Sequence, residues 1–257
     1  MCILHNGSAN FAVAKAGLRW YNAWKGGVFL KDFPIFDTES GISSLILREI
    51  PYRREAYIHI QSVQPEGFWD HLHQCVSFCR MVGAEKIYAE GHEALTAYPL
   101  HAAIREMRGP AWVDGEKLNS LFPVTEATVA RWREICNDRL RGIDHAATLT
   151  AAEEEKILQS GGAYFVHRDG ELLGVGWLED TKLRVVAGVK PGAGEAVMHT
   201  LMSLVEGADM TLEVASTNHR AIALYERLGF VPVGERLCWY DVSQVREEKK
   251  QVFSKNT

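Results

Sequence analysis

A strand–helix–strand pattern occurs twice in this chain, about 126 residues apart, and it limits the possible folds more than any other feature of the sequence. In the first copy, strands at Tyr57–Ile60 and Lys86–Ala89 flank a turn and an amphipathic helix. In the second, strands at Leu183–Val189 and Met210–Ala215 flank a turn at Pro191-Gly192 and another amphipathic helix. The repetition predicts two similar α/β halves rather than one large fold.

The rest of the chain extends this division. We expect residues 1–122 to form the first domain, residues 123–245 the second, and residues 246–257 a charged tail. A helix is predicted over residues 10–24, and another around Tyr98. The second half is predicted to begin with helices at 126–138 and 151–159, followed by a β-hairpin that turns at Asp169-Gly170. Two short strands, near 230–233 and 236–242, are expected to end it.

Charge and composition exclude several classes of protein. The 257 residues include 28 basic and 33 acidic side chains, a net charge of −5, so we expect no general nucleic-acid binding and no binding to an anionic membrane. No apolar stretch approaches the roughly 18 residues of a membrane span, and the first residues do not resemble a secretion signal. The five cysteines are scattered, which favours reduced thiols in a cytoplasmic protein and predicts no metal site.

The stretch from Asn218 to Phe230 is the most specific motif. It predicts an amphipathic helix with Asn218 or a neighbouring residue as its N-cap and Gly229 just after its end. Its order, N-x-x-A-x-x-L-Y-x-x-x-G-F, closely resembles the signature of the GNAT acyltransferase superfamily. The resemblance covers roughly Val124–Val242, whereas the first half is similar only in its strand–helix–strand core. It implies two tandem α/β halves, each a mixed, mostly antiparallel sheet flanked by helices.

The resemblance also implies a site for acyl-CoA. The cofactor would enter where the strand ending at Val189 diverges from the next, with its pyrophosphate on the turn 190–196. The cofactor-binding residues implied are Ala187, Val189, Gly192, Ala193, Gly194, Glu195, Ala196 and Asn218. The turn departs from the family pattern, because Ala193 stands in place of Arg or Gln and the loop is about one residue short. Glu195 adds a carboxylate that opposes a phosphate, and Asn218 either caps its helix or bonds the pantetheine arm.

Two residues are candidates for catalysis. By resemblance, Tyr225 donates a proton to the departing CoA thiolate, although its helical spacing alone predicts a core tyrosine. Glu213 lies on a strand beside the expected cleft and is a candidate general base, but strand alternation could equally point it to solvent. Glu171 and Glu179 on the hairpin have no better claim.

These residues lead to one expected function and two alternatives. We expect transfer of an acetyl group from acetyl-CoA to the primary amine of a small molecule or peptide, by direct attack in a ternary complex, in a monomer or homodimer. The first half, which lacks a glycine-rich turn after Pro65, would be structural or would shape the acceptor pocket. The alternatives are a non-catalytic module that binds acyl-CoA or a metabolite, and a structural protein without a ligand.

Overall fold

The computed structural model describes residues 17–19, 34–111, 119–205 and 207–245. The expected tail at 246–257 and most of the helix predicted over 10–24 lie outside these residues. Within that range, strand β1 (Gly17–Arg19) pairs antiparallel with β2 (Ile35–Asp37), so the helix prediction is wrong there. Pairing with a distant strand outweighs the local helical spacing, which is only a weak preference.

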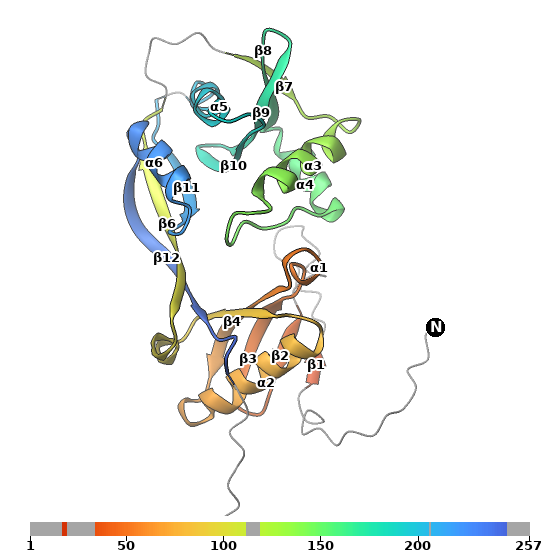
Figure 1. Ribbon diagram of the computed structural model, residues 1–257, viewed down its shortest axis with the longest axis vertical. Coiled ribbons are helices and arrows are strands. Elements are labelled where there is room, and N and C mark those ends of the chain that lie inside the picture. The colour runs from red at the N-terminus through yellow and green to blue at the C-terminus, as the bar shows by residue number, and fades with distance from the viewer. Residues whose placement is uncertain (1–16, 20–33, 112–118, 206, 246–257) are drawn as a thin grey trace, which may run out of the picture. The chain divides into compact units, whose positions relative to one another are not determined.

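The chain divides into two compact units, Met1–His101 with Trp239–Thr257, and Ala102–Cys238 (Figure 1). The chain crosses from one to the other within strands β6 (Leu100–Gly109) and β12 (Val231–Asp241). This division differs from the expected boundary after residue 122. The reason is strand pairing: β6 of the first repeat pairs over six residues with β11 (Met210–Ala215), inside the second unit. In return, the end of β12 pairs with β5 (Lys86–Glu90) in the first unit.

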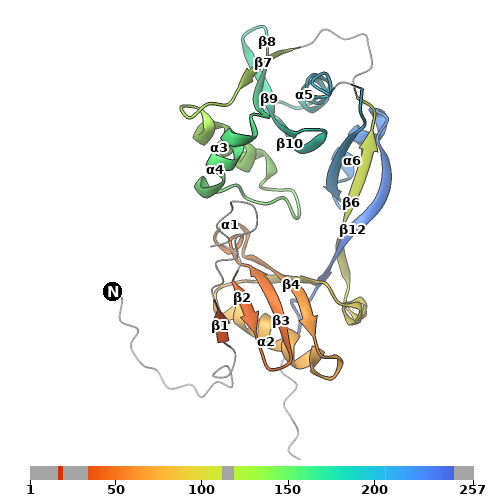
Figure 2. The same cartoon turned by 180° about the vertical axis from the view of Figure 1, so that it is seen from behind.

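In the first unit the strands run in the order β1-β2-β3-β4-β5, followed by the end of β12. Its other elements are β3 (Gly41–Ile46), α1 (Ile50–Arg53), β4 (Glu55–Val63), η2 (Pro65–Gly67), α2 (Phe68–Met81) and η3 (Glu93–Ala97). Strands β4 and β5 are parallel and α2 connects them, which confirms the first predicted strand–helix–strand unit. Helix α2 lies against β3 and β4 (Figure 2) and buries Leu72, Cys75 and Cys79 completely.

The helix predicted around Tyr98 is wrong. A short 3₁₀ turn, η3, ends at Ala97, and β6 begins at Leu100. Tyr98 has extended backbone angles, because the chain there already leads into the strand that pairs with β11.

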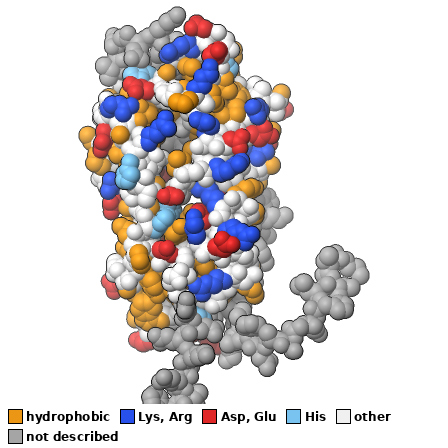
Figure 3. Space-filling view, viewed as in Figure 1, with side chains coloured by type: hydrophobic (Ala, Val, Ile, Leu, Met, Phe, Trp, Pro, Cys, Tyr) orange, Lys and Arg blue, Asp and Glu red, His pale blue; other side chains and the backbone are white. Residues whose placement is uncertain are grey.

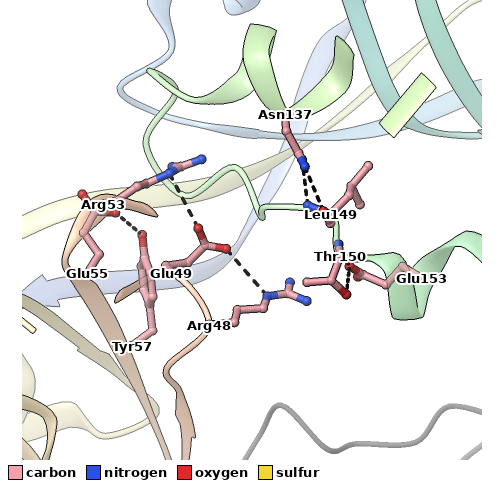
Figure 4. Close-up of polar contacts among 9 residues, drawn as sticks. All are labelled: Arg48, Glu49, Arg53, Glu55, Tyr57, Asn137, Leu149, Thr150 and Glu153. Carbon is pink, nitrogen blue, oxygen red and sulfur yellow. Dashed lines mark hydrogen bonds and ion pairs between the residues drawn. The ribbon is translucent and has the colours of Figure 1, made fainter. Parts of the chain in front are cut away.

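Buried charges in the first unit are paired. Glu49 lies between Arg48 and Arg53, with each Nε at 3.7 Å from its carboxylate (Figure 4). The Tyr57 hydroxyl donates to Glu55, 3.0 Å away, and Glu55 also meets Lys86. These pairs offset the free energy that burial of an isolated carboxylate would cost.

The second unit has the strand order β12-β6-β11-β10-β9-β8-β7. Its other elements are β7 (Ser120–Pro123), α3 (Val129–Leu140), η4 (Ala151–Glu153), α4 (Glu154–Ser160), β8 (Ala163–Arg168), β9 (Glu171–Glu179), β10 (Lys182–Gly188), α5 (Ala193–Met202) and α6 (His219–Arg227). Only β10 and β11 are parallel among the pairs described in this unit. Helices α3 and α4 contribute to one core and α5 and α6 to another, so the expected mixed, mostly antiparallel sheet flanked by helices is confirmed.

Local predictions in the second unit are largely confirmed. Asp169 and Gly170 both have positive φ, 52° and 83°, as a two-residue hairpin turn between β8 and β9 requires. The Asn137 side chain bonds the backbone of Leu149 in both directions, and Thr150 and Glu153 form a capping box (Figure 4). The two short strands expected at the end are instead one long strand, β12, because residues 231–238 belong to the sheet of the second unit and the last residues of the strand pair in the first.

The surface carries charges of both signs. Figure 3 shows acidic and basic side chains interspersed over the face in view. None of the helices in the described ranges is long and apolar enough to cross a membrane. Within those ranges, no three His, Cys, Asp or Glu side chains gather so that they could hold a metal ion.

Candidate cofactor and active site

Strands β10 and β11 separate soon after they begin. They pair only at Lys182↔Thr211 and Leu183↔Leu212 among the residues described. Directly after these pairs, the register of β10 against β9 shifts, and Arg184 is the extra residue. A bulge of this kind bends a strand and increases its twist. From there β10 follows β9 while β11 follows β6, so the divergence expected from the sequence is present.

The backbone of β10 has one edge facing this divergence. The Val189 N–H donates to the Leu173 carbonyl of β9, 2.8 Å away. In an antiparallel ladder, residues that bond one neighbour alternate with residues that face the other way. The backbone N–H and C=O groups of Ala187 therefore also face β9, whereas those of Val186 and Gly188 face the divergence. Ala187 is buried in the core beside α3.

Glycines let helix α5 lie close against the sheet and place its N-terminus. A Cβ at Gly176 would be 2.3 Å from the Leu201 side chain, and one at Gly174 would be 2.7 Å from Val197. A Cβ at Gly188 would be 2.8 Å from the Gly194 nitrogen, so the end of β10 touches the first turn of α5. The N-terminus of α5 therefore lies directly at the end of β10, where its N–H groups and dipole favour an anion.

The turn into α5 is formed as the sequence suggested, and the helix begins at Ala193. Gly192 is the N-cap and has φ 83°, which a side chain would make unfavourable. The Ala193 N–H donates to the Lys190 carbonyl at 3.2 Å. The Ala196 carbonyl accepts from Asn119 and from Thr200, so residues 192–196 are held on both sides.

Opposite charges accompany the two charged residues of the turn. Glu195 meets Arg227 of α6 at 3.0 Å, which offsets the repulsion that its carboxylate would exert on a phosphate. Lys190 meets Glu171 at 2.5 Å, and its hydrogen bond and charge lower the pKa of that carboxyl. Glu171 thus forms an ion pair with the turn, and this contact does not favour it as the general base.

Helix α6 carries the specific motif. Asn218 accepts a hydrogen bond from the Ala221 N–H at 3.2 Å, so its oxygen caps the helix. Its amide nitrogen makes no hydrogen bond among the described residues, so capping leaves a donor for a ligand. Gly229 has φ 85°, as expected of the residue that ends such a helix.

Tyr225 is buried, with 7% of its surface exposed, in the core formed by α5, α6 and β11. Its ring lies 5.9 Å from that of Phe230. Burial raises the pKa of Tyr225 to about 12, so the phenol keeps its proton at neutral pH. This environment suits both a core tyrosine and a proton donor.

Glu213 is the first residue of β11 after the last pair with β10, so it lies where the two strands separate. Its side chain is 41% exposed and meets the Lys182 ammonium at 2.7 Å. Glu179 is instead occupied by Arg184 at 2.6 Å and by Lys156. Of the three carboxylates considered, Glu213 is placed best to act at the divergence.

Two charged residues near Glu213 escaped the sequence reasoning. Glu106 of β6 is the direct partner of Glu213 in the ladder, and Arg236 of β12 forms an ion pair with Glu106. Neither belongs to a recognisable motif. Only the strand that each one pairs with brings it to the site, and local sequence carries no signal for that pairing.

In the described part of the first unit, the corresponding parallel strands do not diverge. Strands β4 and β5 pair at five successive positions, from Glu55↔Lys86 to His59↔Glu90. Just beyond them, a Cβ at Gly91 would be 2.4 Å from the Ile60 carbonyl oxygen, so the two strands remain in contact. The turn into α2 there is Gln64–Gly67, with a single glycine. Among the described residues, diverging parallel strands and a glycine-rich turn occur in the second repeat and not in the first.

The element order, the bulged and diverging parallel strands, and the helix N-terminus at their end define the fold of the GNAT acetyltransferases. By sequence, no protein-family model and no curated protein matches the chain. By structure, a GCN5-related N-acetyltransferase from Anabaena variabilis is similar with a TM-score of 0.57 and 10% identity, over 85% of this chain and 64% of that one.

Two further GNAT structures match with lower scores. An acetyltransferase from the GNAT family of Colwellia psychrerythraea has a TM-score of 0.49 and 12% identity, over 89% of this chain and 92% of that one. A tandem GNAT protein from the clavulanic acid biosynthesis pathway has a TM-score of 0.46 and 13% identity, over 81% of both chains. At 10% identity, the similarity to the Anabaena variabilis protein shows the fold and leaves the chemistry to the site.

Proposed function

We propose that the protein transfers an acetyl group from acetyl-CoA to a primary amine, and that the second unit carries the reaction. One observation supports this most: β10 and β11 diverge, the N-terminus of α5 lies at the end of β10, and Tyr225 of α6 is buried in a core to which both strands contribute. A helix N-terminus, a strand edge that faces the divergence and a buried tyrosine thus occur together in the second unit.

The residues present fit acetyl-CoA. The N–H groups of Gly194 and Glu195 would bind its pyrophosphate, with Gly192 and Ala193 leaving room for close approach, whereas the Ala196 N–H bonds within the helix. The free backbone groups of Val186 and Gly188 would bond the pantetheine amides, while Ala187 and Val189 anchor the strand. The Asn218 amide nitrogen is the further donor to this arm. When bound, the cofactor supplies the thioester that carries the acetyl group.

In the proposed step one bond forms and one bond breaks. The amine nitrogen attacks the thioester carbonyl carbon, the new C–N bond forms, and the C–S bond breaks. Glu213 takes the proton that the ammonium must lose before the attack, and the Tyr225 hydroxyl gives its proton to the departing thiolate. The attacking nitrogen loses its second proton to water as the amide forms. A neutral donor near the thiolate is valuable because burial makes an uncompensated charge costly. Exchange with water then restores both side chains.

The first unit serves a structural role in this proposal, since it lacks the divergence and instead provides β6 to the second unit. We propose a small-molecule or peptide amine as acceptor, no nucleic-acid or membrane partner, and action as a monomer or homodimer. A cytoplasmic location is supported by the buried free thiols Cys75, Cys79 and Cys136.

A non-catalytic module that binds acyl-CoA is the second candidate. The ion pair of Glu213 with Lys182 favours it, because a base held by an ammonium must first exchange that partner. Turnover separates the two candidates, since a binding module releases no free CoA.

Thermal unfolding with and without millimolar acetyl-CoA tests the cofactor, with desulfo-CoA and ATP as controls. At about 100 times the dissociation constant, binding adds ~2.7 kcal/mol, a shift of a few degrees. We expect acetyl-CoA and desulfo-CoA to stabilise the protein and ATP to have no such effect. Release of free thiol on addition of amines then tests catalysis. No shift with either CoA compound would contradict both candidates.

A further inference from the structure

Four charged side chains form a row across neighbouring strands of the second unit. Lys182 of β10 meets Glu213 of β11, Glu213 lies opposite Glu106 of β6, and Glu106 meets Arg236 of β12. Residues directly opposite in an antiparallel ladder point to the same face. The row therefore reads positive, negative, negative, positive along one face of the sheet.

The two central carboxylates are an unfavourable pair for the sheet itself. Like charges directly opposite one another destabilise an antiparallel ladder. Lys182 and Arg236 each offset one of the two charges from the outer ends of the row. A cation bound between them would remove the repulsion.

The position of the row is what gives it a role. Lys182 belongs to the last two pairs that join β10 to β11, and Glu213 is the first residue beyond them. The row thus crosses the sheet where the strands separate, at the place where the proposed reaction needs its amine. Glu106 has only 16% of its side chain exposed, so a cation that reached it would leave bulk water and gain from the charge.

We propose that Glu106 is a positioning residue for the acceptor: it binds the acceptor's ammonium together with Glu213, and selects a cationic amine over a neutral nucleophile. This inference rests on the proposed function. It also gives the first repeat a part in the site, because β6 belongs to that repeat and reaches the second unit only through its pairing with β11.

The test is binding of phenethylammonium to the full chain saturated with desulfo-CoA, measured by calorimetry at neutral pH, with 2-phenylethanol as the uncharged analogue. We expect Glu106→Gln to weaken phenethylammonium about 10- to 100-fold, as loss of a charged hydrogen-bond partner does. Binding of 2-phenylethanol should stay the same, and Glu106→Asp should restore much of the loss. The matched control is Glu235→Gln, which removes a glutamate paired with Arg105 on the same two strands.

Each outcome decides the question. Selective loss in Glu106→Gln and not in Glu235→Gln supports the inference. Equal binding to wild type and Glu106→Gln overturns it, as does a wild type that binds the amine no better than the alcohol. The Glu106→Asp arm keeps the test valid if the glutamine variant unfolds. A desulfo-CoA thermal shift on the same sample identifies failure of the proposed function separately.

Discussion

Gly109 of β6 lies directly against the ring of Phe230, since a Cβ at Gly109 would be 2.3 Å from the Phe230 Cγ. Phe230 closes the motif that begins at Asn218, whereas Gly109 belongs to the other repeat. The second repeat is therefore completed by a strand of the first. Met107, also on β6, is fully buried in the same core.

A fragment of residues 123–257 should fail to fold, although the sequence motif lies wholly within it. Without β6, strand β11 has an unpaired edge, and the ring of Phe230 loses the backbone it packs on. A fragment of residues 100–245 retains that strand and should unfold cooperatively. Urea unfolding followed by near-UV circular dichroism checks both. A cooperative transition in the shorter fragment would show that β6 is dispensable.

Tyr225→Phe should lower turnover by roughly 10- to 1000-fold and leave the affinity for acetyl-CoA nearly unchanged. The hydroxyl is needed only when the thiolate departs, and the ring keeps its packing. Because burial raises the pKa of Tyr225 to about 12, loss of its proton should not reduce wild-type turnover between about pH 8 and 10. Steady-state kinetics with thiol detection gives both values.

The control for that variant is Tyr164→Phe, because Tyr164 packs against the same core from β8. It should retain wild-type turnover. Equal turnover in wild type and Tyr225→Phe would remove Tyr225 from the mechanism.

Gly194→Asp should weaken acetyl-CoA binding by roughly 10-fold or more without loss of stability. The nearest atom to a Cβ at this position is Leu224 Cδ2 at 3.7 Å, so a side chain fits. A carboxylate in the first turn suits the helix dipole but repels a pyrophosphate at the same N–H groups. Calorimetric titration compares it with Gly194→Ala, which should bind nearly as well as wild type. Equal affinity in the aspartate variant would mean that the cofactor lies elsewhere.

One acetyl-CoA should bind to each chain. The second unit has the diverging strands, whereas β4 and β5 of the first stay paired as far as His59↔Glu90. Calorimetry on the full chain gives the stoichiometry directly. Two sites per chain, or one site that survives Gly194→Asp unchanged, would contradict this assignment.

Stability should fall in mild acid because of His71. Its ring is fully buried, with Thr38 Oγ1 and Ser43 Oγ each 2.7 Å from one of its nitrogens. Burial lowers the pKa of His71 below the value of about 6.5 that it has when unfolded. The unfolded chain thus binds a proton that the folded chain does not. The contribution of neutral His71 is present above about pH 6.5 and is lost as the pH falls below it.

Urea unfolding between about pH 8 and 5 measures that dependence, with His71→Gln as the comparison. The variant should lose less stability on acidification than wild type. Parallel curves for the two proteins would show that His71 is not responsible.

Local sequence predicted the elements whose interactions lie close together in the chain. The hairpin turn at Asp169-Gly170 and the α6 helix between Asn218 and Gly229 have the expected form. Caps, turn residues and apolar periodicity act between residues a few positions apart, so their pattern is written in a short stretch of sequence. The position of Tyr225 on a buried helical stripe follows for the same reason.

Pairing between distant segments determined the rest. The sequence around β6 led to an expected helix near Tyr98 and to a boundary at residue 122, and the strand's partner β11 lies in the other repeat. Glu106 and Glu213 lie opposite each other only because β6 and β11 pair in one particular register. Backbone hydrogen bonds form in nearly the same way whatever the side chains are, so the local sequence does not specify which strands pair or in which register. The repeats and the motif were therefore determined by the sequence itself. The tertiary structure decided the exchange of strands between the units, the continuous pairing of β4 with β5 in the first unit, and the row of charges at the divergence in the second.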